Sequence, residues 1–346
     1  MDIPCAPILV DITLNGRTIK AVAQPTKQAF LYVFDRATGQ PIWPIEERPV
    51  AKGDVPGEWY SPTQPFPTKP PAYDRQGSSI DDLINFTPEL RAEAVKLVSR
   101  YKLGPMFTPP VVSNAEGPLG TLAHAVNSGG TVWEGGSFDP ETHILYVFST
   151  TSLNSLALLP SDGTKSDMRY VQGNALSGIR NSTPMGAAPG PAPAVAGEGA
   201  ANPPLTIQGL PLARPPWGRI TAIDVNKGEI LWQIAHGETP DLVRNHPALK
   251  GLTIPRTGRP GRIGTLVTKT LVIAGEGGFF TTPSGQRGAM LRAYNKATGN
   301  EVGAVYMPAP QTGSPMTYML NGKQYIVVAI SGAAYSGEYV AFRLPS

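Results

Sequence analysis

The chain has 346 residues, of which 41% are hydrophobic, enough for a sizeable core, and its 38 glycines and 37 prolines disfavour a mainly helical fold. The net charge of only +3 gives no reason to expect nucleic acid as a partner. The single cysteine, Cys5, excludes an intrachain disulfide, and without a long apolar run or a signal-peptide pattern we expect a soluble chain.

The first predicted elements are β-strands joined by a hairpin turn. Asn15-Gly16 precedes the β-rich run 19–23, and because both residue types tolerate positive φ, the pair predicts a tight turn. A second turn follows, in which Asp35, Gly39 and Trp43 are spaced four residues apart. The aspartate can cap such a turn and the glycine can take its strained backbone position, while the tryptophan packs against a neighbouring sheet.

An insertion is predicted over residues 53–117. It contains the Pro-rich segment 61–67 and then the one convincing helix of the chain, over 87–102. Thr87 is the expected N-cap, Pro88 suits the first helical position, and Gly104 is the expected stop.

The middle of the chain adds a weaker turn and a long loop. Asp139-Pro140 opens a turn of the same kind without the glycine or the tryptophan, and the β-rich run 145–148 follows it. Residues 181–216 are rich in Pro, Ala and Gly and are predicted to form a surface loop. We expect neither this loop nor the insertion 53–117 to be a separate domain, so residues 1–346 are predicted to form one.

The C-terminal third repeats the signals of the N-terminus. Asp224, Gly228 and Trp232 reproduce the full turn motif, and Asn295 and Gly299 keep part of it, with Gly303 in place of the tryptophan. The β-rich runs 271–274 and 325–329 complete the pattern, the second after another Asn-Gly pair at 321–322.

These repeats predict an all-β fold of radially stacked sheets, a β-propeller. The four turns lie too far apart for plain blades of about 40 to 45 residues, so insertions or unmarked blades must separate them. A β-sandwich with a chance likeness between its turns is the alternative.

No motif for a familiar active site is present. The four histidines (His124, His143, His236 and His246) lack metal-binding spacing, and the glycines at 275–278 lack the spacing and the helix of a dinucleotide-binding loop. The residues alone therefore predict a repeat β-protein of unknown activity.

The motif that runs from Ala222 through Asp224 and Gly228 to Trp232 resembles the tryptophan-docking motif of the quinoprotein dehydrogenases. These are eight-bladed propellers that bind pyrroloquinoline quinone (PQQ). The run AQPTKQAFLYVFDR at 23–36 is similar to the family's strand with the cofactor-contacting lysine, and the segments 61–67 and 315–318 are similar to its membrane-type glucose dehydrogenase branch. The resemblance covers essentially the whole chain and implies the C-terminal half of such a protein, a partial propeller of about four blades.

The resemblance implies three site residues. Lys27 sits where the family lysine contacts the quinone oxygens of PQQ, where its charge would stabilise the quinol as it forms. Trp133 matches the tryptophan of the family's Gly-Gly-x-Asn-Trp loop, although Val132 replaces the asparagine. Trp217 is expected to line the central funnel of the propeller, in which the cofactor would bind, or alternatively to pack within the sheets.

The family's catalytic base lies in a Trp-Asp-x-Asp segment, of which Asp2 matches the second aspartate. The base would then precede Met1, and the family's Ca²⁺ ligands lie further upstream, so we expect no metal ligands here. The resemblance implies a PQQ-dependent dehydrogenase of a glucose-like sugar or an alcohol that passes electrons to a quinone or a cytochrome in the periplasm, and we expect this part alone to be inactive.

The alternative is a non-catalytic propeller-like scaffold that binds a protein partner. About four blades cannot close a ring, so the first and last sheets are expected to expose apolar flanks. A missing N-terminal half or a second copy of the chain, in a homodimer, would cover these flanks.

Overall fold

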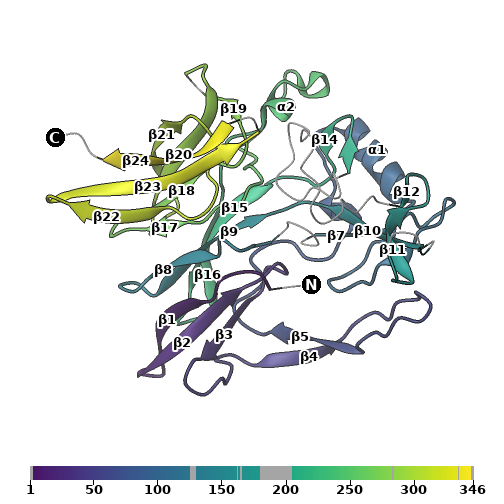
Figure 1. Ribbon diagram of the computed structural model, residues 1–346, viewed down its shortest axis with the longest axis horizontal. Coiled ribbons are helices and arrows are strands. Elements are labelled where there is room, and N and C mark those ends of the chain that lie inside the picture. Colours follow the sequence, from purple (N-terminus) through teal and green to yellow (C-terminus); the bar gives the residue numbers. More distant parts are fainter. Residues whose placement is uncertain are drawn as a thin grey trace.

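The computed structural model describes residues 3–124, 130–161, 163, 166–179, 205–282, 284–333 and 335–343. Four antiparallel sheets lie face to face in the order of the chain (Figure 1). The first sheet contains β1 (Ile8–Leu14), β2 (Arg17–Pro25) and β3 (Leu31–Asp35). The second contains β8 (Gly136–Asp139), β9 (Ile144–Thr150), β15 (Gly218–Asp224) and β16 (Glu229–Ala235).

The third sheet is built from β17 (Leu266–Val267), β18 (Leu271–Gly275), β19 (Phe280–Thr281), β20 (Arg287–Asn295) and β21 (Glu301–Met307). The fourth contains β22 (Met316–Leu320), β23 (Lys323–Gly332) and β24 (Tyr335–Arg343). The predicted hairpins are present, because Asn15-Gly16 joins β1 to β2 and Asn321-Gly322 joins β22 to β23. All four of these turn residues have positive φ, between 50° and 75°.

Apolar side chains fill the space between consecutive sheets. Between the first and second sheets lie Val10, Ile12, Val33, Leu145, Val147 and Ile223, among others. Phe148, Ile220, Ala274 and Tyr294 connect the second sheet to the third, and Ile273, Leu291, Val328 and Ile330 connect the third to the fourth. Side chains on a strand alternate between the two faces of its sheet, and the inner strands β9 and β15 are buried on both faces, so the second sheet presents an apolar face to each neighbour.

The turn motif performs the role that the sequence predicts. Asp35 Oδ1 accepts hydrogen bonds from the two following turn amides at 2.8 and 3.2 Å, and Asp224 Oδ1 does the same at 2.9 and 3.1 Å. A Cβ on Gly228, the motif glycine of the second sheet, would lie 3.0 Å from the ring of Trp43 on the first. Each motif tryptophan thus packs on the glycine of the next copy, because Trp232 lies equally close to Gly299.

The remaining elements form a layer beside the sheets (Figure 1). They are β4 (Ile45–Pro49), β5 (Thr63–Pro67), α1 (Pro88–Val98), β6 (Val111–Val112), β7 (Thr121–Ala123), β10 (Asn154–Pro160), β11 (Tyr170–Asn174), β12 (Gly178–Ile179), β13 (Thr206–Ile207), β14 (Leu210–Pro211) and α2 (Asp241–Arg244), with 3₁₀ turns at Ile80–Asp82 and Pro247–Leu249.

Helix α1 begins where the sequence predicts, after the cap Thr87, whose Oγ1 accepts from the Leu90 amide at 3.2 Å. It ends at Val98, before the predicted end at residue 102, because the Lys102 amide instead donates to the carbonyl of Gly120 at 2.9 Å. Of the predicted loop 181–216, residues up to 204 lie outside the described residues, and the rest includes the short hairpin β13–β14.

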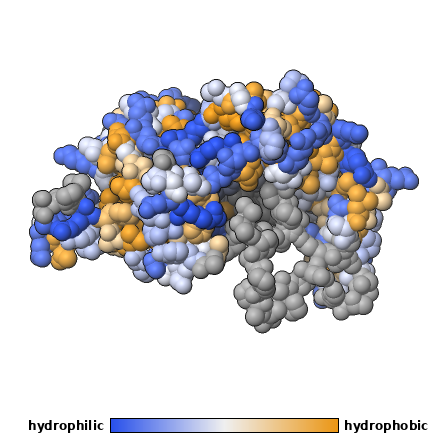
Figure 2. All heavy atoms as spheres, turned by 90° about the horizontal axis from the view of Figure 1, so that it is seen from above, coloured by the Kyte–Doolittle hydropathy of each residue, from blue (hydrophilic) through white to orange (hydrophobic). Residues whose placement is uncertain are grey.

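The fourth sheet has one apolar face that is open to solvent. Val328 and Ile330 of β23 point to the buried face of the sheet. The opposite face is open and is formed by Met316, Tyr318, Leu320, Tyr325 and Tyr339. Tyr339 is 83% exposed and Met316 53% exposed. Figure 2 shows hydrophobic residues reaching the molecular surface in several patches. The expectation that a terminal sheet exposes an apolar flank therefore agrees with this face.

Candidate functional site

Lys27 lies in the tight turn that joins β2 to β3. Thr26 closes this turn, because its Oγ1 is hydrogen-bonded to both the amide and the carbonyl of Phe30, at 3.1 and 3.0 Å. The Ala29 amide donates to the Thr26 carbonyl at 3.0 Å, with Ala29 at a φ of 59°. Lys27 itself is half-buried. The hydrogen bonds of Thr26 and Ala29 hold its backbone on both sides.

The segment that follows β5 clamps this turn from one side. The Tyr73 amide donates to the Ala29 carbonyl at 3.0 Å, and Gln76 Nε2 donates to the Gln28 carbonyl at 2.5 Å. Burial raises the pKa of the Tyr73 phenol, whose side chain is fully enclosed, so the hydroxyl keeps its proton at any physiological pH.

The segment that carries Trp133 clamps the turn from the other side. Gly130 exchanges two backbone hydrogen bonds with Thr150 of β9, at 2.9 and 3.0 Å, and the Thr131 amide donates to the Thr26 carbonyl at 3.3 Å. A Cβ on Gly130, which has a φ of 62°, would collide with the carbonyl oxygen of Lys27. The structure therefore brings the backbones that carry Lys27 and Trp133 into direct contact.

The side chain of Trp133 is half exposed, at 50%. Its ring reaches toward the loop between β21 and β22, where a Cβ on Gly313 would lie 3.6 Å from Cη2. In the same loop, Ser314 Oγ donates to the Glu134 carbonyl at 3.3 Å. The second sheet's Trp133 thus lies between the first sheet's turn and the loop that leads into the fourth sheet.

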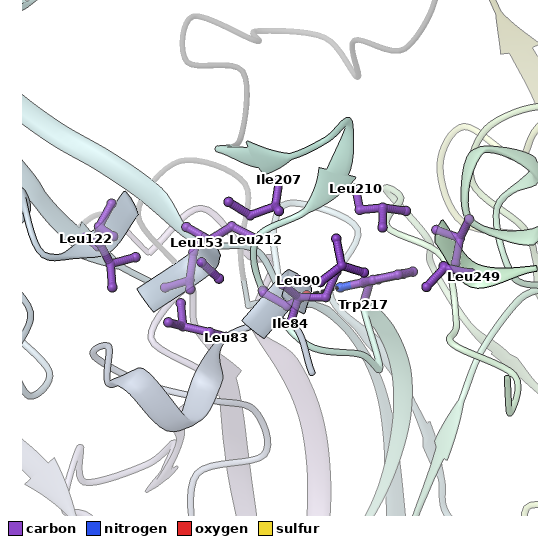
Figure 3. Close-up of a cluster of buried hydrophobic side chains, with 14 residues drawn as sticks. Leu83, Ile84, Leu90, Leu122, Leu153, Ile207, Leu210, Leu212, Trp217 and Leu249 are labelled. Carbon is purple, nitrogen blue, oxygen red and sulfur yellow. Dashed lines mark hydrogen bonds between the residues drawn. The ribbon is translucent and has the colours of Figure 1, made fainter. Parts of the chain in front are cut away.

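Trp217 has a different environment. Its indole is 1% exposed and packs with Ile84, Leu90 and Leu249 in a hydrophobic cluster of the layer that contains α1 (Figure 3). Nε1 donates to the Ala213 carbonyl at 2.7 Å. Only the backbone of Trp217 reaches the site, because its carbonyl accepts from the Thr151 amide at 2.9 Å.

A buried charged cluster beside these segments was not found by sequence reasoning. Asp74 Oδ1 accepts from Thr151 Oγ1 at 2.6 Å and lies 3.4 Å from Arg219 Nη2. Arg75 donates to the carbonyls of Arg214 and Pro215 at 2.5 and 2.7 Å. Burial, together with the charges of Arg219 and Arg214, lowers the pKa of Arg75 to about 10, which still leaves it cationic.

Other candidate features lie elsewhere. A groove of about 660 Å³ on the layer containing α1 is lined by Asp81, Asn85, Phe86, Thr87, Pro88, Arg91 and Arg214. Within the described ranges, no three His, Cys, Asp or Glu side chains are grouped so that they could hold a metal ion. In the same part of the chain, no helix combines the length and the apolar character that crossing a bilayer requires.

Residues 1–326 match the model of the PQQ family, described as the glucose/ethanol/alcohol dehydrogenase β-propeller domain. The chain belongs to this PQQ dehydrogenase family. The predicted family and the predicted partial β-propeller with one helical insertion are thereby confirmed, since the four stacked sheets are blades of a quinoprotein propeller.

Two relatives of this PQQ dehydrogenase family chain illustrate the match. The quinoprotein glucose dehydrogenase of Escherichia coli (strain K12) is 30% identical over 362 residues, covering 100% of this chain and 41% of the relative. The quinate/shikimate dehydrogenase (quinone) of Acinetobacter baylyi is 32% identical over 346 residues, covering 98% and 40%. The chain therefore spans about two fifths of the length of these relatives.

Among solved structures, the quinohemoprotein alcohol dehydrogenase from Comamonas testosteroni matches 98% of this PQQ dehydrogenase family chain and 38% of its own chain, with a TM-score of 0.47 and 17% identity. Asp2, which the resemblance matches to the second aspartate of the family's base segment, lies outside the described residues.

Proposed function

We propose that the turn carrying Lys27 and the segment carrying Trp133 form one side of a PQQ site. The site would belong to a dehydrogenase of glucose-like sugars or of alcohols that passes electrons to a quinone or a cytochrome, in the periplasm. The contact between Thr26 and Thr131, which joins the two backbones, is the observation that carries the proposal. The sugar, quinate, glycerol and alcohol dehydrogenases among the relatives support this substrate class.

The residues present suit such a cofactor. PQQ is a planar anion, and it would supply a quinone that accepts two electrons and becomes a quinol. A half-exposed indole such as Trp133 offers a flat face for stacking, and the ammonium of Lys27 offers charge to the quinone oxygens. Trp217 would contribute indirectly, because its backbone carbonyl accepts a hydrogen bond from the Thr151 amide.

We further propose that the 346-residue chain does not oxidise a sugar or an alcohol by itself. Dehydrogenation needs a base for the hydroxyl proton. Asp74 is a described carboxylate of this network, where Thr151 and Arg219 already hold it in place. Among the described residues no three His, Cys, Asp or Glu side chains are grouped as metal ligands, so we assign no step to the Ca²⁺ that the resemblance implies.

Titration of the full chain with PQQ tests the proposed site. We expect saturable binding that Lys27→Ala weakens by about tenfold or more, the range expected for losing a charge-assisted contact. Lys20→Ala is the matched control, because Lys20 is an exposed lysine on β2 of the same sheet. Unchanged affinity in Lys27→Ala, or no binding by the wild-type chain, would contradict the site. PQQ-dependent dye reduction with glucose would contradict the proposed inactivity.

The open face of the fourth sheet favours a second candidate, a non-catalytic scaffold that binds a protein partner. This face exposes Tyr339 and Met316 over a sheet whose other side is buried. The partner would be the remaining blades of a longer propeller or a second copy of the chain. Light scattering distinguishes the homodimer, and a compact monomer at every concentration would contradict it.

A further inference from the structure

Tyr73 stands out among the buried residues because its hydroxyl lies between two different sheets. The ring is fully enclosed in the hydrophobic cluster between the first and second sheets. The hydroxyl oxygen lies 3.2 Å from the Thr26 amide, 3.0 Å from the Thr26 carbonyl and 3.0 Å from Thr131 Oγ1. Neither the turn motif nor the family resemblance draws attention to this residue.

The direction of these hydrogen bonds follows from counting donors and acceptors. A tyrosine hydroxyl has one proton to donate and accepts from other groups. It accepts from the Thr26 amide, so its proton goes either to the Thr26 carbonyl or to Thr131 Oγ1. The Thr26 carbonyl already accepts from the amides of Ala29 and Thr131, whereas Thr131 Oγ1 has committed its own proton to the Phe148 carbonyl at 2.7 Å. Thr131 Oγ1 is therefore the better acceptor.

The result is a hydroxyl relay of defined direction. It runs from the Thr26 amide to the Tyr73 hydroxyl, on to Thr131 Oγ1 and finally to the Phe148 carbonyl on β9. One end of the relay is the residue before Lys27, and the other end anchors the residue two positions before Trp133. The apolar contacts between the two sheets do not depend on direction, whereas this relay is satisfied in only one register.

We propose that Tyr73 is a positioning residue that fixes the Lys27 turn against the Trp133 segment. The proposal rests on the proposed PQQ site for its functional meaning. The ring of Tyr73 fills the interface, and the single oxygen atom sets the register of the two site segments. Without this oxygen, the buried Thr26 amide would lack a partner, and Thr131 Oγ1 would lose the proton that it accepts.

Tyr73→Phe removes this oxygen and keeps the ring. In hydrogen exchange of the full chain without PQQ, we expect amides of residues 26–30 and 130–133 to exchange about tenfold faster, as expected for the loss of a buried hydrogen bond. Tyr146→Phe is the matched control. Tyr146 is also fully buried and donates to a backbone carbonyl, that of Lys296 at 3.0 Å, so its loss should leave residues 26–30 unchanged.

Thr131→Val provides a second route to the same result, because valine keeps the shape of threonine but cannot accept the Tyr73 proton. It should speed exchange at residues 26–30, and the double variant should add little to either single change. Unchanged exchange at 26–30 in both Tyr73→Phe and Thr131→Val, or full additivity, overturns the positioning role.

PQQ binding provides the readout that separates positioning from structure. We expect Tyr73→Phe to weaken PQQ binding about tenfold and to alter the absorption spectrum of the bound quinone, while Tyr146→Phe changes neither. Faster exchange with no PQQ binding by the wild-type chain would uphold the relay and overturn the proposed function. PQQ binding that Tyr73→Phe leaves unchanged would overturn the positioning role and leave the proposed function standing.

Discussion

The contact between the second and third sheets and the contact between the third and fourth sheets differ at the tryptophan position of the turn motif. At the first contact, Trp232 of β16 lies on Gly299, and its Nε1 donates to the Lys296 carbonyl at 3.2 Å. At the second, Gly303 of β21 stands where the tryptophan would be, and nothing lies within 4 Å of a Cβ placed there. All residues of β21 except Met307 are exposed, whereas most of β16 alternates between exposed and half-buried positions. The tryptophan thus ties the outermost strand of one blade to the next blade, whereas β21 contributes only Met307 to the apolar cluster between the third and fourth sheets.

Replacing the tryptophan should cause the largest loss of stability at the contact between the second and third sheets. Trp232→Ala removes the ring from Gly299 and from Tyr146, whose ring centroid lies 5.7 Å away, so we expect a loss of about 3 kcal/mol in the free energy of unfolding. Denaturant unfolding measures the change. Trp59→Ala is the control, since Trp59 is 81% exposed, and equal losses in the two variants would show that the motif does not stabilise the interface.

A buried histidine makes the second–third contact sensitive to acid. His236 Nε2 donates to the Gly275 carbonyl and Nδ1 accepts from the Tyr294 hydroxyl, both at 2.8 Å. Burial, assisted by the charges of Arg292 and Arg256, lowers the pKa of His236 to about 4. Between pH 6.5 and 4 the unfolded chain binds a proton here that the folded chain does not. The free energy of unfolding therefore decreases as the pH is lowered through this range, by about 3 kcal/mol in total.

Unfolding of the wild type and of His236→Gln across this pH range tests the expectation. Glutamine can still donate to the Gly275 carbonyl but does not titrate, so the difference in unfolding free energy between the two proteins should narrow as the pH falls. A difference that is constant from pH 7 to pH 4 would contradict the role assigned to His236.

The smallest expected effects on stability come from two glycine substitutions, which compare a crowded motif glycine with a glycine in open space. Gly228→Ala places a methyl group against Trp43 in a backbone of positive φ and should cost about 1–3 kcal/mol. Gly303→Ala places the same methyl group in open space and should change stability by less than about 0.5 kcal/mol. Equal effects in thermal unfolding would mean that docking on the motif glycine contributes nothing.

Local sequence signals were sufficient for the parts of the fold that depend on neighbouring residues. The Asn-Gly hairpins, the caps at Asp35 and Asp224 and the start of α1 each require residues only a few positions apart. The end of α1 was predicted wrongly, since the partner of Lys102 is Gly120, which no local pattern indicates. Repetition of the turn motif was enough to predict stacked sheets, because a tryptophan needs a second surface to cover it.

The candidate site was accessible only in part. The family resemblance led to Lys27 and Trp133, which the fold does bring onto touching segments. Asp74 pairs with Thr151 and Tyr73 with Thr131, positions separated by 77 and 58 residues, so no spacing rule connects them. Trp217 shows the limit of the resemblance, because the sequence left open whether its side chain faces the cofactor or packs, and the structure encloses it with Ile84 and Leu90.

Gly130 has a consequence for how such a protein can change over time. Because Gly130 has no side chain, the Lys27 carbonyl can approach its backbone closely. A single methyl group at this position would push the first two blades apart. Substitutions of Lys27 or Trp133 would remove a chemical group and leave the architecture intact. Any side chain at position 130 would instead keep both groups and move them apart, so this position tolerates little variation although it has no chemistry of its own.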